Sequence, residues 1–265
     1  QIYWKYDRAS EVFRNYLREF SYGSFRLNAQ FYLAECLMSS GGNKEEALQL
    51  YRQVIDVPNN QFLEQALIAA SSMLYDREEF SESLAYYEKL ENAAATSDVR
   101  IIALKGQLRS AYQEGDAQKS IGIARKIKNT AGVPEELERE AIFIEAKAYY
   151  SLNQYDEALA DFRRVATEII SIEGAESKYR VAEILFMKGN IDESEKVVTQ
   201  FIDQNSPHQY WMAKMFLLLS DISLKKGDTL QARATLQSLR EYYTISDDGI
   251  LDEVRSKLAA LDQGN

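Results

Sequence analysis

The chain has 265 residues, of which 46% are hydrophobic and 27% charged, and its formal net charge is −10. This composition is typical of a folded protein. The acidic balance repels nucleic-acid phosphates, so we expect no nucleic-acid partner. The 3 prolines and 12 glycines are few helix breakers for this length and predict helices throughout.

A small residue recurs along the chain at spacings of 36 to 38 residues, each time followed by apolar or small residues four and seven positions later. The small residues are Ala9, Ala47, Ser83, Ser120, Ala158, Ser194 and Ala232. Residues at these offsets lie on one face of a helix. Each unit therefore contains an amphipathic helix whose small residue lets a neighbouring helix approach closely.

The residue five positions before each small residue is predicted to form a helix corner. It is Gly or Asn in every full unit except one, which has Glu78. The other corner residues are Gly42, Gly115, Asn153, Gly189 and Gly227. Gly and Asn tolerate the left-handed conformation that ends a helix, and an apolar helical pattern precedes each corner. Each unit is thus predicted to be an antiparallel helix pair. Gly106 and Gly122 lie inside predicted helices and predict a softer joint around Ser120.

The three prolines fall between units and interrupt no predicted helix. They are Pro58, Pro134 and Pro207. Ser206 followed by Pro207 is typical of an N-cap and the first residue of a helix.

In chain order we expect one repeat domain over 1–265. Its parts are a truncated repeat at 1–22, six full repeats at about 23–59, 60–97, 98–133, 134–172, 173–206 and 207–245, and a capping helix at about 247–262. The truncated repeat opens with Ile2, Tyr3, Trp4 and Tyr6 and lacks a partner helix. Because an uncovered end of an array is apolar, we expect further repeats before Gln1, or self-association through this end.

The stretch 148–165, AYYSLNQYDEALADFRRV, closely resembles the corner and second helix of a tetratricopeptide repeat. Gly115-Asp116 and Gly227-Asp228 match the Gly-Asp corner of that family. The resemblance covers nearly the whole chain. It implies an all-α, right-handed α-solenoid of antiparallel helix pairs, a superhelix that binds other proteins. Another kind of helical-pair solenoid, or an irregular helical bundle, is the alternative.

The units are longer than the family's usual period of about 34 residues. With phrases such as 31–37, FYLAECL, they resemble repeats of bacterial envelope proteins, the periplasmic Tol–Pal coordinators and outer-membrane assembly lipoproteins. The stretch 218–239 is similar to repeats of Bacteroidetes proteins. This resemblance favours a periplasmic or outer-membrane-associated location over a cytoplasmic one.

Residues for catalysis and metal binding are scarce. The single cysteine, Cys36, excludes an intrachain disulfide, and with the single histidine, His208, it cannot complete a metal site. We expect His208 in a solvated turn. Acidic runs are typical of solvated faces, and no loop has a phosphate-binding pattern. We therefore expect no enzyme, no cofactor and no metal, and the lack of about 20 consecutive apolar residues predicts no membrane insertion.

In tetratricopeptide repeats the first helix of each pair lines the concave face, so its non-core residues are candidate partner contacts. By this resemblance the candidates are Tyr32, Tyr75, Lys105, Arg109, Tyr112, Phe143, Lys147, Tyr150, Tyr179 and Phe186. Tyrosine is enriched at interfaces. The alternative is that these aromatics pack between neighbouring helices. The charges between the aromatic rows predict a surface that is basic in the middle and acidic toward the C-terminal end.

These residues favour a scaffold or adaptor that binds a peptide or helix of a partner protein on its concave face. The resemblance adds envelope assembly as its setting. Two alternatives remain at this point: an accessory or sensor repeat module of a larger multidomain protein, and saccharide binding by the aromatic strip.

Overall fold

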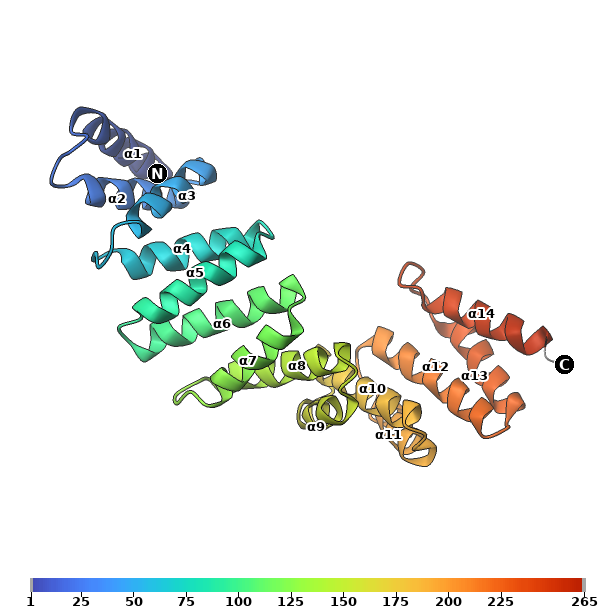
Figure 1. The fold of residues 1–265 in the computed structure, drawn as a ribbon. Coiled ribbons are helices and arrows are strands. Elements are labelled where there is room, and N and C mark those ends of the chain that lie inside the picture. The colour runs from blue at the N-terminus through green and yellow to red at the C-terminus, as the bar shows by residue number, and fades with distance from the viewer. Residues whose placement is uncertain (1, 264–265) are drawn as a thin grey trace. The chain divides into compact units, whose positions relative to one another are not determined.

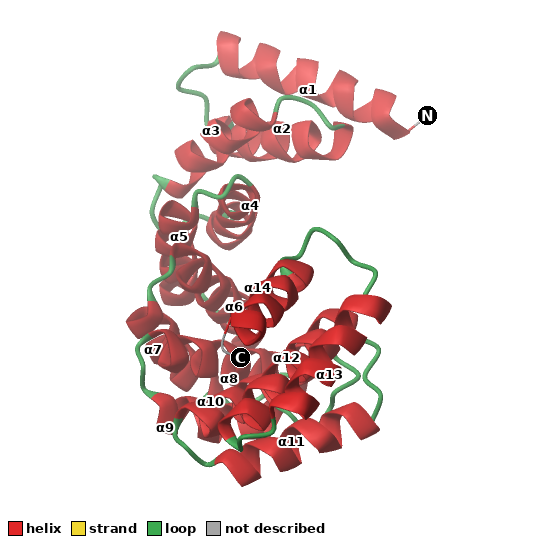
Figure 2. Ribbon diagram, turned by 90° about the vertical axis from the view of Figure 1, so that its right-hand side faces the viewer, coloured by secondary structure: helices red, strands yellow, loops and turns green. Residues whose placement is uncertain are grey.

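The computed structural model describes residues 2–263, and side chains within this range from Lys5 onward. The described residues form fourteen helices and no strand (Figures 1 and 2). The expected all-α fold, an α-solenoid of antiparallel helix pairs, is confirmed. The side chains of Ile2, Tyr3 and Trp4, part of the apolar end that the sequence predicts, are not among those that the structure describes.

The chain divides into two compact units, Gln1–Ala141 and Ile142–Asn265. The helices of the first unit are α1 (Ile2–Glu19), α2 (Arg26–Ser40), α3 (Lys44–Ile55), α4 (Leu63–Asp76), α5 (Phe80–Ala93), α6 (Ser97–Glu114) and α7 (Ala117–Lys128). Those of the second are α8 (Glu135–Ser151), within which the division falls, α9 (Tyr155–Val165), α10 (Ile172–Met187), α11 (Ile191–Asp203), α12 (Gln209–Lys225), α13 (Thr229–Tyr242) and α14 (Ile250–Gln263). From α2 to α13, each even-numbered helix is the first helix of a pair and the next is the second.

The corners within pairs share one backbone geometry. One or two residues after the end of the first helix, the backbone has a positive φ, 80° at Gly115, 83° at Gly227 and 58° at Asn153. In the Gly-Asp corners, the following aspartate then accepts a hydrogen bond from the third amide beyond it, as Asp116 does from Lys119 (2.9 Å). The glycine ends one helix and the aspartate caps the next, which is why this dipeptide suits the corner.

One detail of the predicted corners is corrected. Gly41, with φ of 69°, is the left-handed residue after α2, while Gly42 donates its amide to the Leu37 carbonyl (2.8 Å). Glu78, the compositional exception, nevertheless adopts the same left-handed conformation with φ of 62°. The backbone path between the helices, more than residue preference, sets this conformation.

The predicted cap of α12 is wrong by two residues. The helix begins at Gln209, and its N-cap is His208. Ser206 donates its hydroxyl to the Ile169 carbonyl (3.0 Å) and accepts from the His208 amide (3.4 Å). Ser206 does not cap α12, because its hydroxyl is engaged with Ile169, 37 residues away in the chain.

The recurring small residues lie where the two helices of a pair meet. Ala47, Ser83, Ala158, Ser194 and Ala232 each have a relative exposure of 0%. Serine at this position also joins the pair: Ser83 donates to the Ser71 carbonyl (2.9 Å), and Ser194 donates to the Ala182 carbonyl (2.7 Å). These sites accept alanine or serine because no larger side chain fits between the helices.

The hydrophobic core is continuous from α2 to α6 in the first unit. In the second unit, one cluster joins α10, α11 and α12, and a separate cluster joins α12, α13 and α14. We call these the α10–α12 cluster and the α12–α14 cluster. The terminal helix α14 contributes Ile250, Val254 and Leu258 to the latter.

None of the helices in the described part of the chain combines the length and apolar character needed to cross a bilayer.

Candidate functional site

In the first unit, three of the predicted contact residues line one pocket between α4, α5 and α6. They are Tyr75, Lys105 and Arg109, and the pocket has a volume of about 350 Å³. Ser72, Asp76, Tyr87, Ile102 and Gly106 complete its lining. The pocket therefore brings together two tyrosines, two cations, one carboxylate and an apolar side chain.

Gly106 allows this arrangement because it has no side chain. A Cβ atom there would lie 2.3 Å from the Tyr87 ring, far inside van der Waals contact. Tyr87 thus packs directly against the α6 backbone. Burial raises the pKa of the Tyr87 hydroxyl, so the phenol remains neutral at ordinary pH.

The two cations of this pocket differ. Arg109 forms a two-point ion pair with Glu140, with Nε–Oε1 and Nη2–Oε2 distances of 2.6 and 2.9 Å. This contact raises the pKa of the Arg109 guanidinium. Lys105 is exposed and forms no ion pair with any described residue. Lys105 is therefore the cation that this pocket can offer to a partner, beside the exposed carboxylate of Asp76.

The other two predicted residues of the first unit do not line the pocket. Tyr32 is 44% exposed, and its ring packs against Phe13 and Phe62 with centroid distances of 6.0 and 5.5 Å. Tyr112 is half-buried. Tyr32 therefore packs between helices and is also accessible to a partner.

In the second unit, the predicted tyrosines converge on Glu183. Tyr150 and Tyr179 donate their hydroxyls to the two oxygens of this carboxylate at 2.9 and 2.8 Å. Arg180 binds Glu183 at 2.7 Å, and its guanidinium lies 4.7 Å from the Tyr150 ring centre. Burial and the Glu183 charge raise the pKa of Tyr150 to about 12. The same two causes raise the pKa of Tyr179.

The remaining predicted residues of this unit lie on α8 and α10. Lys147 is 3.3 Å from Glu176 and 5.2 Å from the Phe143 ring centre. Tyr179 is only 5% exposed and packs against Trp211, and half-buried Phe186 packs against the α10–α12 cluster. Tyr179 and Phe186 therefore contribute mainly to packing, while Lys147, Phe143 and Tyr150 remain partly accessible.

Comparison with known proteins relates two segments of the chain to a known family. Residues 5–61 and 143–210 match the tetratricopeptide repeat family. A tetratricopeptide repeat protein from Parabacteroides merdae is similar in structure over 86% of this chain and 98% of its own, with a TM-score of 0.51 and 14% identity.

YrrB, a tetratricopeptide repeat protein described as having an unusual peptide-binding site, is similar over 78% of this chain and 97% of its own. Its TM-score is 0.56 and its identity is 16%. The chain has the tetratricopeptide repeat fold. No curated protein matches its sequence.

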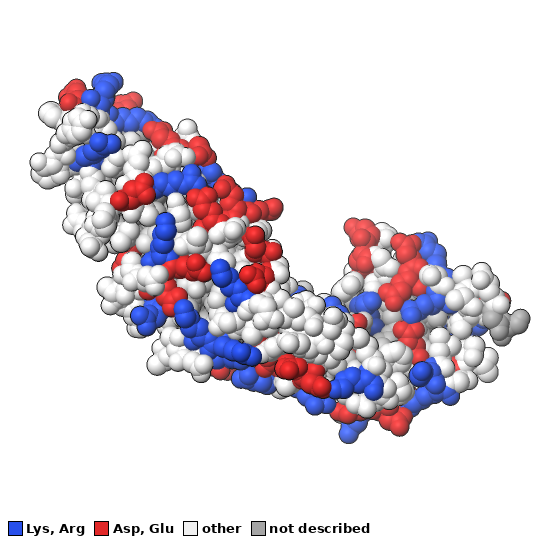
Figure 3. Space-filling model, viewed as in Figure 1, with Lys and Arg blue, Asp and Glu red and all other residues white. Residues whose placement is uncertain are grey.

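Ion pairs join neighbouring first helices of the solenoid. Arg109 pairs with Glu140, Lys147 with Glu176, and Asp221 with Lys257 of α14 at 2.5 Å. The charges of Arg109, Lys147 and Asp221 are therefore each balanced by a partner on the next first helix or on α14, and Glu183 is balanced by Arg180 of its own helix. On the face shown in Figure 3, basic and acidic side chains are accordingly interspersed.

Sequence reasoning missed Arg180 and Glu176. Both lie on α10 outside the positions that the repeat pattern singles out. A signal was present in the spacing: Glu176, Arg180 and Glu183 are three and four residues apart, so they share one helix face. The contacts with Lys147 and Tyr150 of α8 were not accessible from spacing alone.

The single cysteine and histidine lie apart from these surfaces. Cys36 is buried on α2, and burial together with the Glu35 charge raises the pKa of its thiol. His208, expected to be solvated, is half-buried, and its Nε2 lies 2.7 Å from the Ile170 carbonyl oxygen. Within the part of the chain that the structure describes, no three His, Cys, Asp or Glu side chains are grouped to hold a metal.

Proposed function

We propose that the chain is a non-catalytic interaction scaffold whose first helices receive a peptide or helix of a partner protein. The pocket at Tyr75, Lys105 and Arg109 is the observation that carries this proposal. It combines aromatic side chains, an apolar side chain, a cation without an ion pair and an exposed carboxylate. These are the elements by which interfaces anchor a side chain of the partner.

Two further observations support the same role. Tyr150 and Arg180 form a rigid aromatic and cationic surface, because Glu183 holds both of them. A surface whose rotamers are already fixed loses little entropy when a partner binds. The peptide-binding site named for YrrB, whose fold is similar, also favours a peptide as the occupant.

The test is to select peptides from a random display library against the whole chain and to measure their affinities for two variants. Ser72→Trp fills the pocket from an exposed position on α4. Gln113→Trp adds the same bulk at an exposed position of α6 outside the pocket. We expect Ser72→Trp to weaken binding about tenfold or more, and Gln113→Trp to leave it unchanged.

Circular dichroism of both variants checks that each remains folded. Peptides that bind wild type and Ser72→Trp equally would show that the pocket is not the docking site. A library that yields no binder to the wild-type chain would contradict the scaffold function itself.

We also propose that this scaffold works in a bacterial envelope, on the basis of the sequence resemblance of its long repeats to envelope proteins. Fractionation of the native cells, followed by detection of the chain with an antibody, tests this location. Recovery in the cytoplasmic fraction alone would exclude it.

A further inference from the structure

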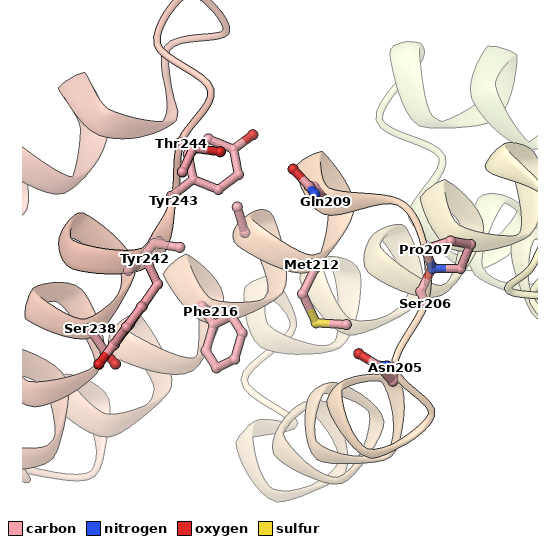
Figure 4. Close-up of a pocket in the computed structure, with 12 residues that line it drawn as sticks. Asn205, Ser206, Pro207, Gln209, Met212, Phe216, Ser238, Tyr242, Tyr243 and Thr244 are labelled. Carbon is pink, nitrogen blue, oxygen red and sulfur yellow. The ribbon is translucent and has the colours of Figure 1, made fainter.

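A second pocket, of about 580 Å³, lies away from the surfaces described above, against one side of α12. Figure 4 shows Met212 and Phe216 projecting from α12 into a space bounded by Tyr242 at the end of α13 and by Pro207 in the link before α12. All of its lining residues belong to the second unit, within 205–244. It is thus separate from the Tyr150–Glu183 contacts on α8 and α10.

The pocket lies where the two hydrophobic clusters of this unit meet. Met212 packs on the α10–α12 cluster, whereas Ala213 and Leu239 belong to the α12–α14 cluster. The first unit has one continuous cluster across the equivalent helices. At the break between the two clusters, half-buried Met212 and Phe216 line the pocket.

Elsewhere within the units, ion pairs join neighbouring second helices. Arg52 pairs with Glu82 between α3 and α5 at 2.7 Å, and Arg163 pairs with Glu193 between α9 and α11 at 2.7 Å. Among the described residues, no ion pair joins α11 to α13. Lys226 reaches α11 only from the α12–α13 corner, at the other end of these helices. Within the part of the chain that the structure describes, the second helices α11 and α13 are therefore not joined to each other by charge.

The chemistry of the lining selects the ligand. None of the twelve lining residues carries a formal charge. A charged ligand would lose its hydration without gaining a partner, which is strongly unfavourable. Met212, Phe216 and Leu239 provide an apolar base, while Gln209 and Ser238 offer hydrogen-bonding groups. The volume lies within the range of roughly 300–1,000 Å³ that is usual for small-molecule sites.

Aromatic side chains bound this space on two sides. Tyr242 is 75% exposed, so its ring is available to a ligand, and Phe216 is half-buried on the facing helix. Rings at such positions favour a flat, aromatic occupant through offset or edge-on packing. We propose that this pocket binds an uncharged small aromatic molecule that carries a hydrogen-bonding substituent. This site is independent of the peptide-binding role proposed for the first helices.

Met212 makes a direct experiment possible, because the chain has only 5 methionines. With ¹³C-methyl-labelled methionine, the Met212 signal, assigned with Met212→Leu, reports on this pocket. p-Cresol serves as the neutral probe, and 4-methylbenzoate and 4-methylbenzylammonium are its charged counterparts. We expect p-cresol to shift the Met212 signal saturably, with a dissociation constant of about 1 mM or tighter. The signals of exposed Met38 and Met187 should not move.

Two variants locate the effect. Ser238→Trp fills the pocket from an exposed position of α13 and should weaken p-cresol binding about tenfold or more, whereas Gln237→Trp, exposed and outside the lining, should bind as wild type. The proposal is wrong if the Met212 shift does not saturate, or if 4-methylbenzoate binds as tightly as p-cresol. It is also wrong if N-acetyl-leucyl-leucinamide binds there more tightly, since the pocket would then dock a protein segment.

Discussion

At the scale of single residues, the two glycines inside α6 and α7 have opposite surroundings. A Cβ on Gly106 would collide with the Tyr87 ring, whereas a Cβ on Gly122 would have no neighbour within 4 Å. Both were interpreted from the sequence in the same way, as weak points of a helix. Only Gly106 has a packing reason to be glycine, and the softer joint expected around Ser120 stays a prediction.

This difference predicts opposite effects of the same substitution. Gly106→Ala should lower the free energy of unfolding by about 1–3 kcal/mol, because the methyl group displaces the Tyr87 ring. Gly122→Ala should raise it by about 0.5–1 kcal/mol, because alanine loses less backbone entropy in an exposed helix. Urea denaturation of the two variants measures both values. Equal effects would mean that Tyr87 moves freely away from α6.

Glu78 shows how a single residue can conflict with its position. Its left-handed conformation, with φ of 62°, costs about 1–2 kcal/mol for a residue that has a Cβ atom. The other corners between paired helices use glycine or asparagine. The helices α4 and α5 therefore hold this corner in place through their packing.

At the scale of elements, first helices are joined to each other through polar side chains as well as through the core. Glu183 of α10 accepts a hydrogen bond from Tyr150 of α8 and forms an ion pair with Arg180 of its own helix. An exposed ion pair alone contributes little, about 0–1 kcal/mol. The shared carboxylate fixes several side chains in one arrangement, which matters more for the shape of the surface than for the stability of the unit.

The raised pKa of Tyr150 predicts a loss of stability at high pH. In the folded chain this pKa is about 12, above the ordinary tyrosine value of about 10. The stabilisation is therefore complete below pH of about 10 and is lost as pH rises toward 12, since the unfolded chain releases the proton first. Across this pH interval, the melting temperature of Tyr150→Phe should fall less steeply with pH than that of wild type.

A matched control is Tyr22→Phe, because Tyr22 is 96% exposed. This variant should follow the wild-type pH dependence. A Tyr150→Phe variant with an unchanged pH dependence would indicate that the contact with Glu183 does not persist in solution.

At the scale of the whole molecule, each helix packs mainly on its neighbours in sequence, as expected for a repeat protein. The terminal helix α14 illustrates this, because fully buried Val254 packs only within the α12–α14 cluster. A substitution at Val254 should therefore destabilise the neighbouring helices and leave distant repeats unchanged.

Val254→Ala should cost about 2 kcal/mol through the lost methyl groups and the cavity they leave. Amide hydrogen exchange should accelerate in α12, α13 and α14 and stay unchanged in α2 and α3. Val12→Ala on α1, where Val12 is 59% exposed, is the control and should change little. Uniform acceleration along the chain would show that the repeats unfold as one cooperative body.

The candidate site was only partly predictable. Tyr75 lies on α4, and Lys105 and Arg109 lie on α6, at three different positions of the repeat, and all three are on the face that the family resemblance assigns to partner contacts. The basic middle that the sequence predicts for that surface is not present as free charge, because ion pairs balance it. Arg109 finds a partner in Glu140, 31 residues further on, and such a pairing depends on how two helices lie together.

By itself, the sequence determined the helices, their pairing and their corners. These follow from local rules: apolar residues that recur on one helical face, small residues where helices meet, and residues that accept a positive φ. The tertiary structure alone decided the contacts between repeats. It placed Tyr87 on Gly106, drew Ser206 to Ile169, and left an uncharged pocket beside Met212. Each of these depends on the distance between side chains on different helices, which no local pattern encodes.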